Sequence, residues 1–410
     1  MTMQNPFSAI EAPAARDLWL AGLGVNMVRW LEILVFGLLA LQLTGSPFWV
    51  AVMTFARMLP LLSGVVLASL VRALPKRSVL LGVFALLTLT AATLWLLAAQ
   101  GRLELWHLVV AAFMAGFAWT LEVPIRRTAL AEAVGLERVQ GSMGLEVVSN
   151  QITRIIGPAL GGLMLDTVGP TGIFALGAIV QGTGLWLVWR MVEPVPLKPP
   201  GPPTGLAQSI AEGFAYVRRH RLLMGTVMVT LVFNFWGFPY VAIAPVIGET
   251  ILGLSPTGIG LLAAVDAVGA LIAAFIIIEW AGSRDFALIY SLGATLFMVC
   301  TLCFGYATTA PMATLALFIA GFGLAGFNAM QISLPIAATR PAMRVRAMSM
   351  VTVAIGAAPF GFLHAGLMAE WLGAAWAQRL IASEGLIALA VVFWLWPELL
   401  KREAPRPLEP

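Results

Sequence analysis

The feature that most constrains this chain is a succession of apolar runs, separated by short segments that hold most of the charges. A helix of about 20 apolar residues is long enough to cross the hydrocarbon core of a bilayer. Only 11% of the residues are charged, whereas about 25% are charged in an average soluble domain. The chain is therefore predicted to be an all-α, polytopic membrane protein.

The apolar runs predict twelve transmembrane helices. They lie near residues 18–43, 47–71, 78–99, 103–125, 142–166, 171–190, 222–248, 256–279, 286–307, 311–335, 345–369 and 375–397. The longest polar segment separates the sixth run from the seventh, so we expect six-helix bundles over 1–191 and 222–410, joined by a cytoplasmic linker over 192–221. The proline-rich start of this linker is typical of extended chain. Apolar residues recur at helical spacing from Leu206 to Val217, which predicts an amphipathic helix on the membrane surface.

Basic residues predict the orientation. Of the 24 Lys and Arg residues, 19 fall in segments on one side, 2 on the other side and 3 within predicted spans. Positive charges are enriched in cytoplasmic loops, so both termini are predicted to be cytoplasmic. Basic clusters are then membrane anchors, and no nucleic-acid partner is expected. The polar segment before the first span lacks the features of a cleavable signal peptide, so that span is expected to be retained.

Ionic residues occur at one depth within the predicted spans. At about 1.5 Å of rise per residue, Arg29, Arg57, Arg154 and Asp266 all lie near the membrane midplane, and Glu32 lies about one turn beyond it. Exposure of each ion to lipid would cost at least about 2.5–3.5 kcal/mol. These side chains are therefore expected to face a cavity or one another.

Two helix faces carry polar side chains toward that depth. On the first span Asn26, Arg29 and Glu32 are three residues apart and form a stripe. On the fifth span Glu146, Asn150 and Arg154 step by four residues toward the motif Gly157, Pro158, Gly161 and Gly162. Glycines four apart let two membrane helices approach closely. The alternative is a purely structural helix crossing beside an arginine that reaches toward the membrane surface.

Aromatic and amide side chains cluster near the same depth and are candidates for a substrate cavity. They are Asn26, Trp30, Trp119, Asn234, Trp236, Phe238, Asn328 and Gln331. Such a mixture lines pockets for amphipathic ligands, although each residue is also explained as core or lipid-facing surface. Three buried arginines against two acids favour a substrate with carboxylate, phosphate or catecholate groups. Glu122 and Glu146 could neutralise that excess.

Several short motifs follow one another along nearly the whole chain. They include Leu18-Trp19, Arg57-Met58-Leu59-Pro60, Pro124-Ile125-Arg126-Arg127-Thr128-Ala129, Gly157-Pro158-Ala159-Leu160-Gly161-Gly162 and Gly356-Ala357-Ala358-Pro359-Phe360-Gly361. In order and spacing they resemble the major facilitator superfamily, and within it the branch of efflux proteins that includes the enterobactin exporter and macrolide efflux pumps. The resemblance implies two pseudo-symmetric six-helix bundles in a bacterial inner membrane. One departure is Ser69, which stands near the usual aspartate of the loop after the second span.

The resemblance also implies a mechanism. In that fold the first, fourth, seventh and tenth spans line the cavity and the fifth crosses the eighth, so Arg154 and Asp266 become a candidate ion pair that opens and closes during alternating access. A static pair is the alternative. Glu32 is the candidate for the coupling proton, with Glu122 and Asp266 as rivals, and a permanent Arg29–Glu32 pair is the other possibility. The glycine-proline motif resembles one associated with proton-driven export.

Enzymatic function is not expected. The chain has no Walker lysine loop, HExxH or GxSxG motif, its three histidines are scattered, and its two cysteines lie within an apolar run, so no metal or cofactor is predicted. The predicted function is a monomeric, proton-coupled exporter of a small amphipathic compound, anionic ones included, such as a siderophore or drug. An importer on the same fold is the alternative. A membrane sensor or receptor is a more remote one.

Overall fold

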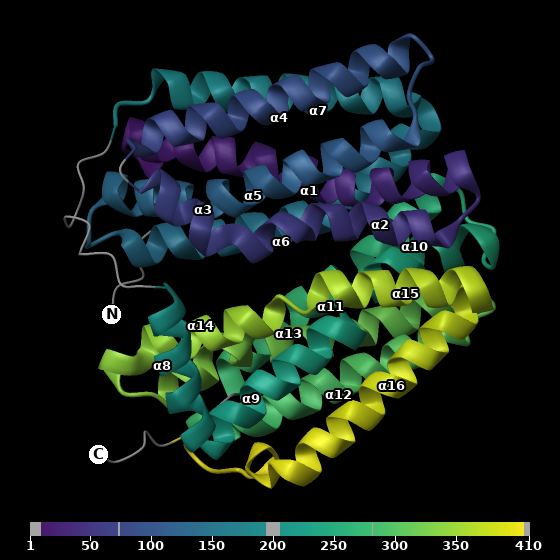
Figure 1. Ribbon diagram of the computed structural model, residues 1–410. Coiled ribbons are helices and arrows are strands. Elements are labelled where there is room, and N and C mark those ends of the chain that lie inside the picture. The colour runs from purple at the N-terminus through teal and green to yellow at the C-terminus, as the bar shows by residue number, and fades with distance from the viewer. Residues whose placement is uncertain (1–9, 73, 194–205, 281, 406–410) are drawn as a thin grey trace. The chain divides into compact units, whose positions relative to one another are not determined.

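The computed structural model describes residues 10–72, 74–193, 206–280 and 282–405 (Figure 1). Within these ranges the regular structure is helical, as predicted. Ten helical segments of the described chain are long and apolar enough to cross a membrane, and Pro47–Ser63 is a shorter apolar helix. The all-α membrane class is therefore confirmed, whereas the count of twelve spans and the division into two bundles stay predictions.

The helices before the linker are longer than a bilayer crossing requires in several cases. Proline at the first helical position starts α1, and Gly45 ends it in the left-handed conformation, with φ 68°, which glycine adopts without strain. The elements are α1 (Pro13–Thr44), α2 (Pro47–Met58), η2 (Leu59–Ser63), α3 (Gly64–Val71), α4 (Lys76–Ala99), α5 (Leu105–Val134), α6 (Val139–Thr167) and α7 (Gly169–Arg190).

The predicted linker contains the helix α8, as expected from the spacing after Leu206. The proline run before α8 lies outside the described residues. The elements are α8 (Leu206–Arg219), α9 (Arg221–Val232), η3 (Phe233–Gly237), α10 (Tyr240–Thr250), α11 (Pro256–Trp280), η4 (Ser283–Asp285), α12 (Phe286–Gly305), α13 (Ala310–Ala337), η5 (Pro341–Met343), α14 (Arg344–Ile355), α15 (Ala358–Leu372), α16 (Ala374–Leu395) and η6 (Pro397–Leu400).

Three predicted spans are interrupted. The second contains the 3-10 helix η2 around Pro60, because proline lacks the amide hydrogen and clashes with the preceding turn of an α-helix. The seventh contains the π-helix η3, followed by Pro239. The eleventh breaks at Gly356 and Ala357, ahead of Pro359. Apolar periodicity predicted the length of these segments but not their breaks.

The chain forms two compact units. Unit 1 holds Met1–Gly45, Met53–Pro202 and Ser255–Ala264, and unit 2 holds Ser46–Val52, Pro203–Leu254 and Val265–Pro410. In unit 1, α1 packs against α5, α6 and α7, and α4 packs against α5 and α7. In unit 2, α12 packs against α13 and α16, and α15 packs against α16. The first residues of α2 and of α11 thus belong to a different unit from the rest of each helix.

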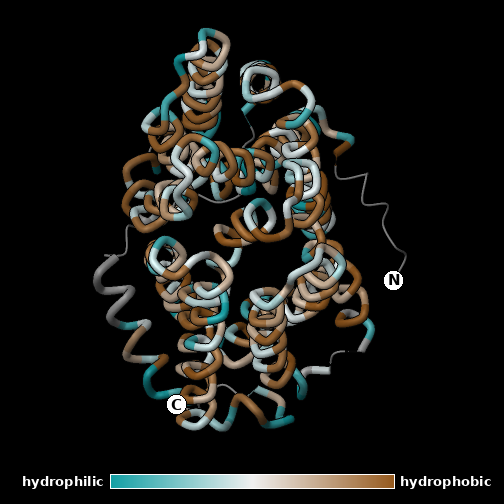
Figure 2. The backbone as a smooth tube through the Cα atoms, turned by 90° about the vertical axis from the view of Figure 1, so that its right-hand side faces the viewer, coloured by the Kyte–Doolittle hydropathy of each residue, from teal (hydrophilic) through white to brown (hydrophobic). Residues whose placement is uncertain are grey.

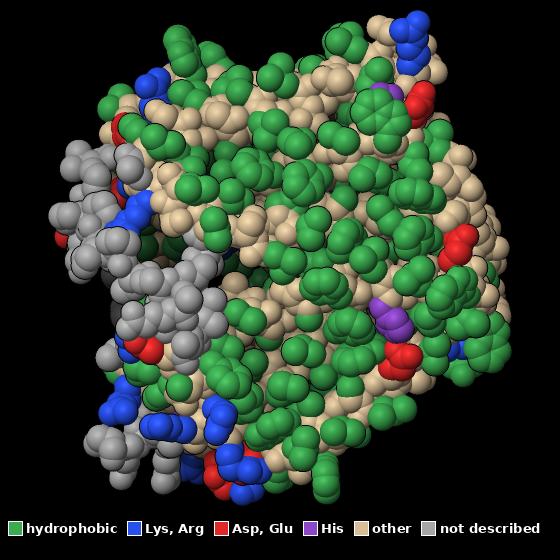
Figure 3. Space-filling model, viewed as in Figure 1, with side chains coloured by type: hydrophobic (Ala, Val, Ile, Leu, Met, Phe, Trp, Pro, Cys, Tyr) green, Lys and Arg blue, Asp and Glu red, His purple; other side chains and the backbone are tan. Residues whose placement is uncertain are grey.

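The surface has the character of a membrane protein. Hydrophobic residues predominate along the helices of both units (Figure 2). On the face drawn in Figure 3, hydrophobic side chains cover the middle of the helices, and most lysine and arginine side chains lie toward helix ends. Large side chains such as Trp186, Phe275 and Trp394 are exposed, which is expected where lipid rather than water is the solvent.

The glycine-proline motif of α6 is a close-packing site within unit 1. A Cβ atom at Gly157 would lie 2.7 Å from Cβ of Trp30, and one at Gly161 would lie 3.1 Å from Cγ of Leu31, so these glycines pack against α1. On another side of the helix, a Cβ atom at Gly162 would overlap the Pro256 carbonyl at the start of α11. Gly157 and Gly161 thus lie where α6 approaches α1 closely, and Gly162 lies where it approaches the start of α11.

Candidate functional site

A network of buried ion pairs lies inside unit 1, and Glu122 is at its centre. Glu122 lies on α5 and is 0% exposed. Its Oε2 atom accepts a hydrogen bond of 2.8 Å from Arg29 of α1, whose other terminal nitrogen donates to Asn26 Oδ1 at 2.6 Å. Its Oε1 atom accepts a hydrogen bond from Arg126, one turn further along α5. Two guanidinium groups therefore hold one carboxylate.

Arg126 extends the network to α6. Its Nη1 atom donates to Glu146 Oε1 at 2.6 Å, and Arg127 reaches the other oxygen of Glu146 at 3.9 Å. Gly22 of α1 makes room for Arg126, because a Cβ atom at that position would overlap its guanidinium group. The network thus joins three helices through charge-assisted hydrogen bonds, which are about twice as strong as neutral ones.

Glu32 has a different partner from the one considered in the sequence. Arg57 Nη2 donates to Glu32 Oε2 at 2.8 Å, so the ion pair joins α2 to α1. Arg29, three residues before Glu32, is turned to Glu122 instead. The permanent Arg29–Glu32 pair is therefore wrong. Arg57 also lies over the ring of Phe36, at 5.3 Å from its centroid.

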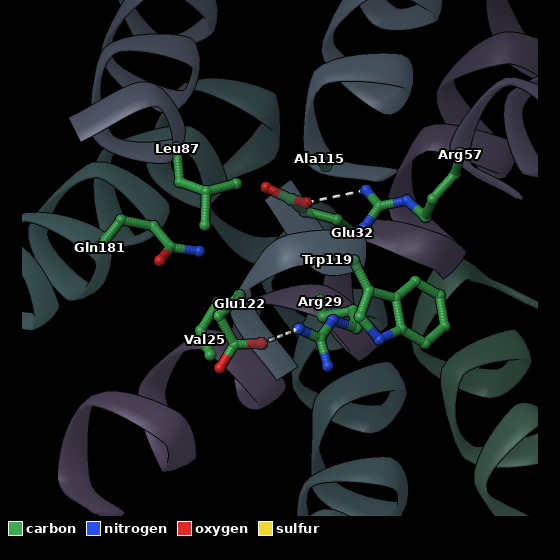
Figure 4. Close-up of a pocket in the computed structure, with 9 residues that line it drawn as sticks. All are labelled: Val25, Arg29, Glu32, Arg57, Leu87, Ala115, Trp119, Glu122 and Gln181. Carbon is green, nitrogen blue, oxygen red and sulfur yellow. Dashed lines mark hydrogen bonds and ion pairs between the residues drawn. The ribbon is translucent and has the colours of Figure 1, made fainter. Parts of the chain in front are cut away.

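A small cavity of about 10 Å³, roughly the space that one water molecule needs, lies between these two sets of ion pairs (Figure 4). It is lined by Val25, Arg29, Glu32, Arg57, Leu87, Ala115, Trp119, Glu122 and Gln181. Arg29 lies over the Trp119 ring at 4.7 Å from its centroid. Gln181 of α7 is 3% exposed, and its Oε1 atom has no hydrogen-bond partner among the described residues. The cavity therefore combines ions, an aromatic face and an available acceptor.

The buried charges of this site balance. Three arginines, Arg29, Arg57 and Arg126, face three glutamates, Glu32, Glu122 and Glu146. Within these ion pairs no positive charge is in excess, because Glu122 and Glu146, the two acids named in the sequence as able to neutralise it, offset Arg29 and Arg126. Arg154, the other arginine first counted, is partly exposed. Binding of a polar ligand at this site would therefore depend on which ion pair is broken, and not on a net charge of the site.

The polar face of α6 continues beyond Glu146 along α1. Asn150 Oδ1 accepts a hydrogen bond of 3.3 Å from the Trp30 indole, and the Arg154 guanidinium lies over the same ring, at 5.6 Å from its centroid. Trp30 of α1 therefore packs against α6 and does not line the cavity of Figure 4. Arg154 belongs to unit 1 and Asp266 to unit 2, so their pairing stays a prediction.

The remaining predicted residues lie in unit 2. Asp266 is buried and accepts a hydrogen bond from the Tyr240 hydroxyl. Asn234 donates to the carbonyl of Thr230 at 2.8 Å, which ties its side chain to its own helix. The other four do not form one cluster: Trp236 bonds Glu384, Phe238 contacts the edge of Phe362, Asn328 is exposed, and Gln331 is partly buried.

Two residues of the site were missed in the sequence. The predicted fourth span ends at residue 125 and so places Arg126 in a cytoplasmic loop. In the structure α5 continues to Val134 and contains Arg126. The spacing of Glu122 and Arg126 by four residues was the signal that could have found it. Gln181 had no such signal, since a single glutamine within an apolar run has no partner in the sequence.

Comparison with known proteins places the chain in a family. The family model of transmembrane secretion effectors, a branch of the major facilitator superfamily, matches residues 4–405. The chain belongs to this family. A search of curated proteins found no match. This family is consistent with the resemblance to the major facilitator superfamily that the sequence motifs indicate.

Solved structures show the same fold at low identity. A bacterial homologue of the human lysosomal transporter Spinster, inward-facing and unoccupied, has a TM-score of 0.74 at 13% identity over 95% of this chain and 98% of that one. A peptide transporter has a TM-score of 0.75 at 12% sequence identity, over 95% of each chain. The nucleoside transporter NupG has a TM-score of 0.72 at 12% sequence identity, over 96% of this chain and 100% of that one. The protein is a membrane transporter of the major facilitator type, and not an enzyme.

Proposed function

We propose that this transporter exports a small amphipathic compound in exchange for protons, by alternating access of a cavity to the two sides of the membrane. The family description, secretion, supports the direction. The proton gradient is the proposed energy source, and no cofactor is needed. The proposed setting is a bacterial inner membrane, in which the protein works as a monomer with both termini in the cytoplasm.

The observation that carries the proton proposal is the unequal pairing of the two carboxylates that line the cavity. Glu122 is held by two arginines, whereas Glu32 is held by Arg57 and its side chain is 12% exposed. Protonation of Glu32 therefore breaks one ion pair, and protonation of Glu122 breaks two. Because each broken buried pair leaves an uncompensated charge, Glu32 is the less costly place to bind a proton.

Protonation of Glu32 also has a consequence for the substrate. It would free the guanidinium of Arg57 at the wall of the cavity, where a polar group of the substrate can replace the carboxylate. Trp119 offers an aromatic face and Gln181 an acceptor to the same ligand. A siderophore or a drug-like compound has this mixture of apolar and polar groups. The balanced charges give no preference for an anionic compound.

The second element of the proposal is a gate formed by Arg154 and Asp266. We keep it as a proposal because both residues are ionic and sit at matched positions in the predicted spans. The close packing of Gly157, Gly161 and Gly162 gives α6 a tight contact surface in unit 1 on which such a change can act. If Arg154 and Asp266 form a working gate, a double charge swap should transport better than either single change.

The deciding experiment measures flux in proteoliposomes under an imposed pH gradient, with amphipathic fluorescent dyes of both charge signs as probes. Wild-type protein should move a dye against the proton flow, and Glu32→Gln should lose the gradient-driven part while keeping downhill exchange. Glu137→Gln, an exposed glutamate outside the site, is the matched control. Gradient-driven flux that survives in Glu32→Gln would refute the assignment, and flux in the direction of the protons would mean import.

A further inference from the structure

A second polar cluster lies in unit 2, and Glu384 of α16 is its centre. The Oε2 atom of Glu384 accepts a hydrogen bond of 2.9 Å from the Trp236 indole and lies 2.8 Å from Nε2 of His364 on α15. The ring of Phe235 stacks on the His364 imidazole, with centroids 5.6 Å apart. Three separate helical segments therefore supply one hydrogen-bonded group.

The backbone around this cluster is built to hold it. Phe235 and Trp236 lie in the π-helix η3, and short π-helical turns inside α-helices frequently occur at functional sites. A Cβ atom at Gly361, one turn before His364, would overlap the carbonyl of Phe235. A Cβ atom at Gly385, next to Glu384, would lie 2.9 Å from Cβ of Trp236. Two glycines thus let α15 and α16 close on the π-helix.

The position of the cluster makes its charge costly. His364 and Glu384 lie inside the candidate membrane spans Arg344–Leu372 and Ala374–Leu395, yet their side chains are 26% and 34% exposed. A carboxylate in such surroundings is expensive and is retained chiefly where it has a function.

Most other charged groups on the elements packed against α15 and α16 have partners of their own. Arg221 pairs with Glu398, Glu370 accepts from Ser46, and Arg379 donates to the carbonyl of Gly305. Glu249 of α10 is a further carboxylate, and its buried Oε2 atom has no hydrogen-bond partner among the described residues. The tyrosines of these elements bond Asp266 and Thr230, and the thiols of Cys300 and Cys303 lie on α12. Among the described residues, Glu384 is hydrogen-bonded to Trp236 and His364.

We propose that His364 and Glu384 together form a proton-binding site of unit 2. With one proton shared between the imidazole and the carboxylate, the pair is neutral and suits a membrane environment. When that proton leaves to water, Glu384 keeps a negative charge that the Trp236 indole N–H stabilises. Because Trp236 is in the π-helix, binding and release change the hydrogen bonding of the segment between α9 and α10. This site is separate from Glu32 and does not depend on the proposed export.

The test uses the pH dependence of tryptophan emission in the purified full-length protein, between about pH 8 and pH 5, the range in which histidine charge changes. Subtraction of the Trp236→Phe titration isolates the signal of Trp236. That signal should change with pH in the wild type and be lost in His364→Gln and in Glu384→Gln. It should persist in His107→Gln, which removes an imidazole outside the cluster whose ring centroid lies 3.8 Å from that of Trp106.

The Trp106 signal, isolated in the same way with Trp106→Phe, checks folding in each variant. A variant that keeps the Trp106 signal and loses the Trp236 signal supports the proposal, as does partial recovery in Glu384→Asp. A Trp236 signal that does not change with pH in the wild type, or that is unchanged in both single variants, overturns it. Neither substrate nor gradient is present, so the result is independent of the flux assay.

Discussion

Glu122→Gln is the most informative single change in unit 1, because it keeps the shape of the side chain while it removes the charge and turns one of the two acceptor oxygens into a donor amide group. Arg29 and Arg126 would then share Glu146 as the nearest buried anion of their network, one positive charge in excess. Removing one partner of a buried ion pair costs about 3–5 kcal/mol. At about 2–4 °C per kcal/mol for a unit of this size, the apparent melting temperature in detergent should fall by about 6–20 °C.

A double-mutant cycle separates this charge effect from simple damage to packing. Arg29→Gln combined with Glu122→Gln leaves the Arg126–Glu146 pair intact and restores neutrality, so the double variant should lose at least about 0.5–3 kcal/mol less than the sum of the single losses. Glu137→Gln, on the surface, should melt like the wild type. If Glu122→Gln also melts like the wild type, or if the two losses simply add, the buried network does not stabilise unit 1 as described here.

Three further changes test packing and charge. Gly22→Ala should destabilise the protein by displacing Arg126, whereas Gly177→Ala, where a new Cβ would have ordinary contacts of 3.6 Å and 3.8 Å, should not; comparable melting of the two variants would contradict this. Gly162→Ala would place a methyl group against the Pro256 carbonyl and should lower the free energy of unfolding by about 1–3 kcal/mol. Gly144→Ala on the same helix, where a Cβ meets nothing within 4 Å, should change it little. Equal melting temperatures of these two variants would argue against the close contact of α6 at Gly162. Burial of Glu398 is the largest single influence and opposes its ionisation, but the hydrogen bond from Arg221, a backbone hydrogen bond and the positive charges of Arg221 and Lys401 together outweigh it and lower the pKa of Glu398 below its ordinary 4.5. The stabilising contribution of that pair is therefore complete above the ordinary pKa and is lost as the pH falls through the lowered one, so the difference in melting temperature between wild type and Glu398→Gln should narrow on acidification from neutral pH.

The helical class could be predicted from the sequence because apolar runs of spanning length have few other uses. The breaks within them could not. Pro60 was visible, yet membrane helices often contain proline without ending, as Pro124 in α5 and Pro158 in α6 show. The π-helix η3 depends on how tightly α15 and α16 close on it, through Gly361 and Gly385, and that is a property of packing and not of local sequence.

The site was predictable as a set of ions at one depth, but its pairing was not. Spacing by three residues brings Arg29 and Glu32 to the same side of α1, and it leaves open which partner each will take from a neighbouring helix. A carboxylate that is fully buried, as Glu122 is, needs donors on both oxygens, and Arg29 and Arg126 supply them. Glu32 is then left to Arg57, which lies on α2 and is far from it in sequence. The choice of partner follows from which carboxylate is most deeply buried, and that depth is set by the packing of α1 against α5.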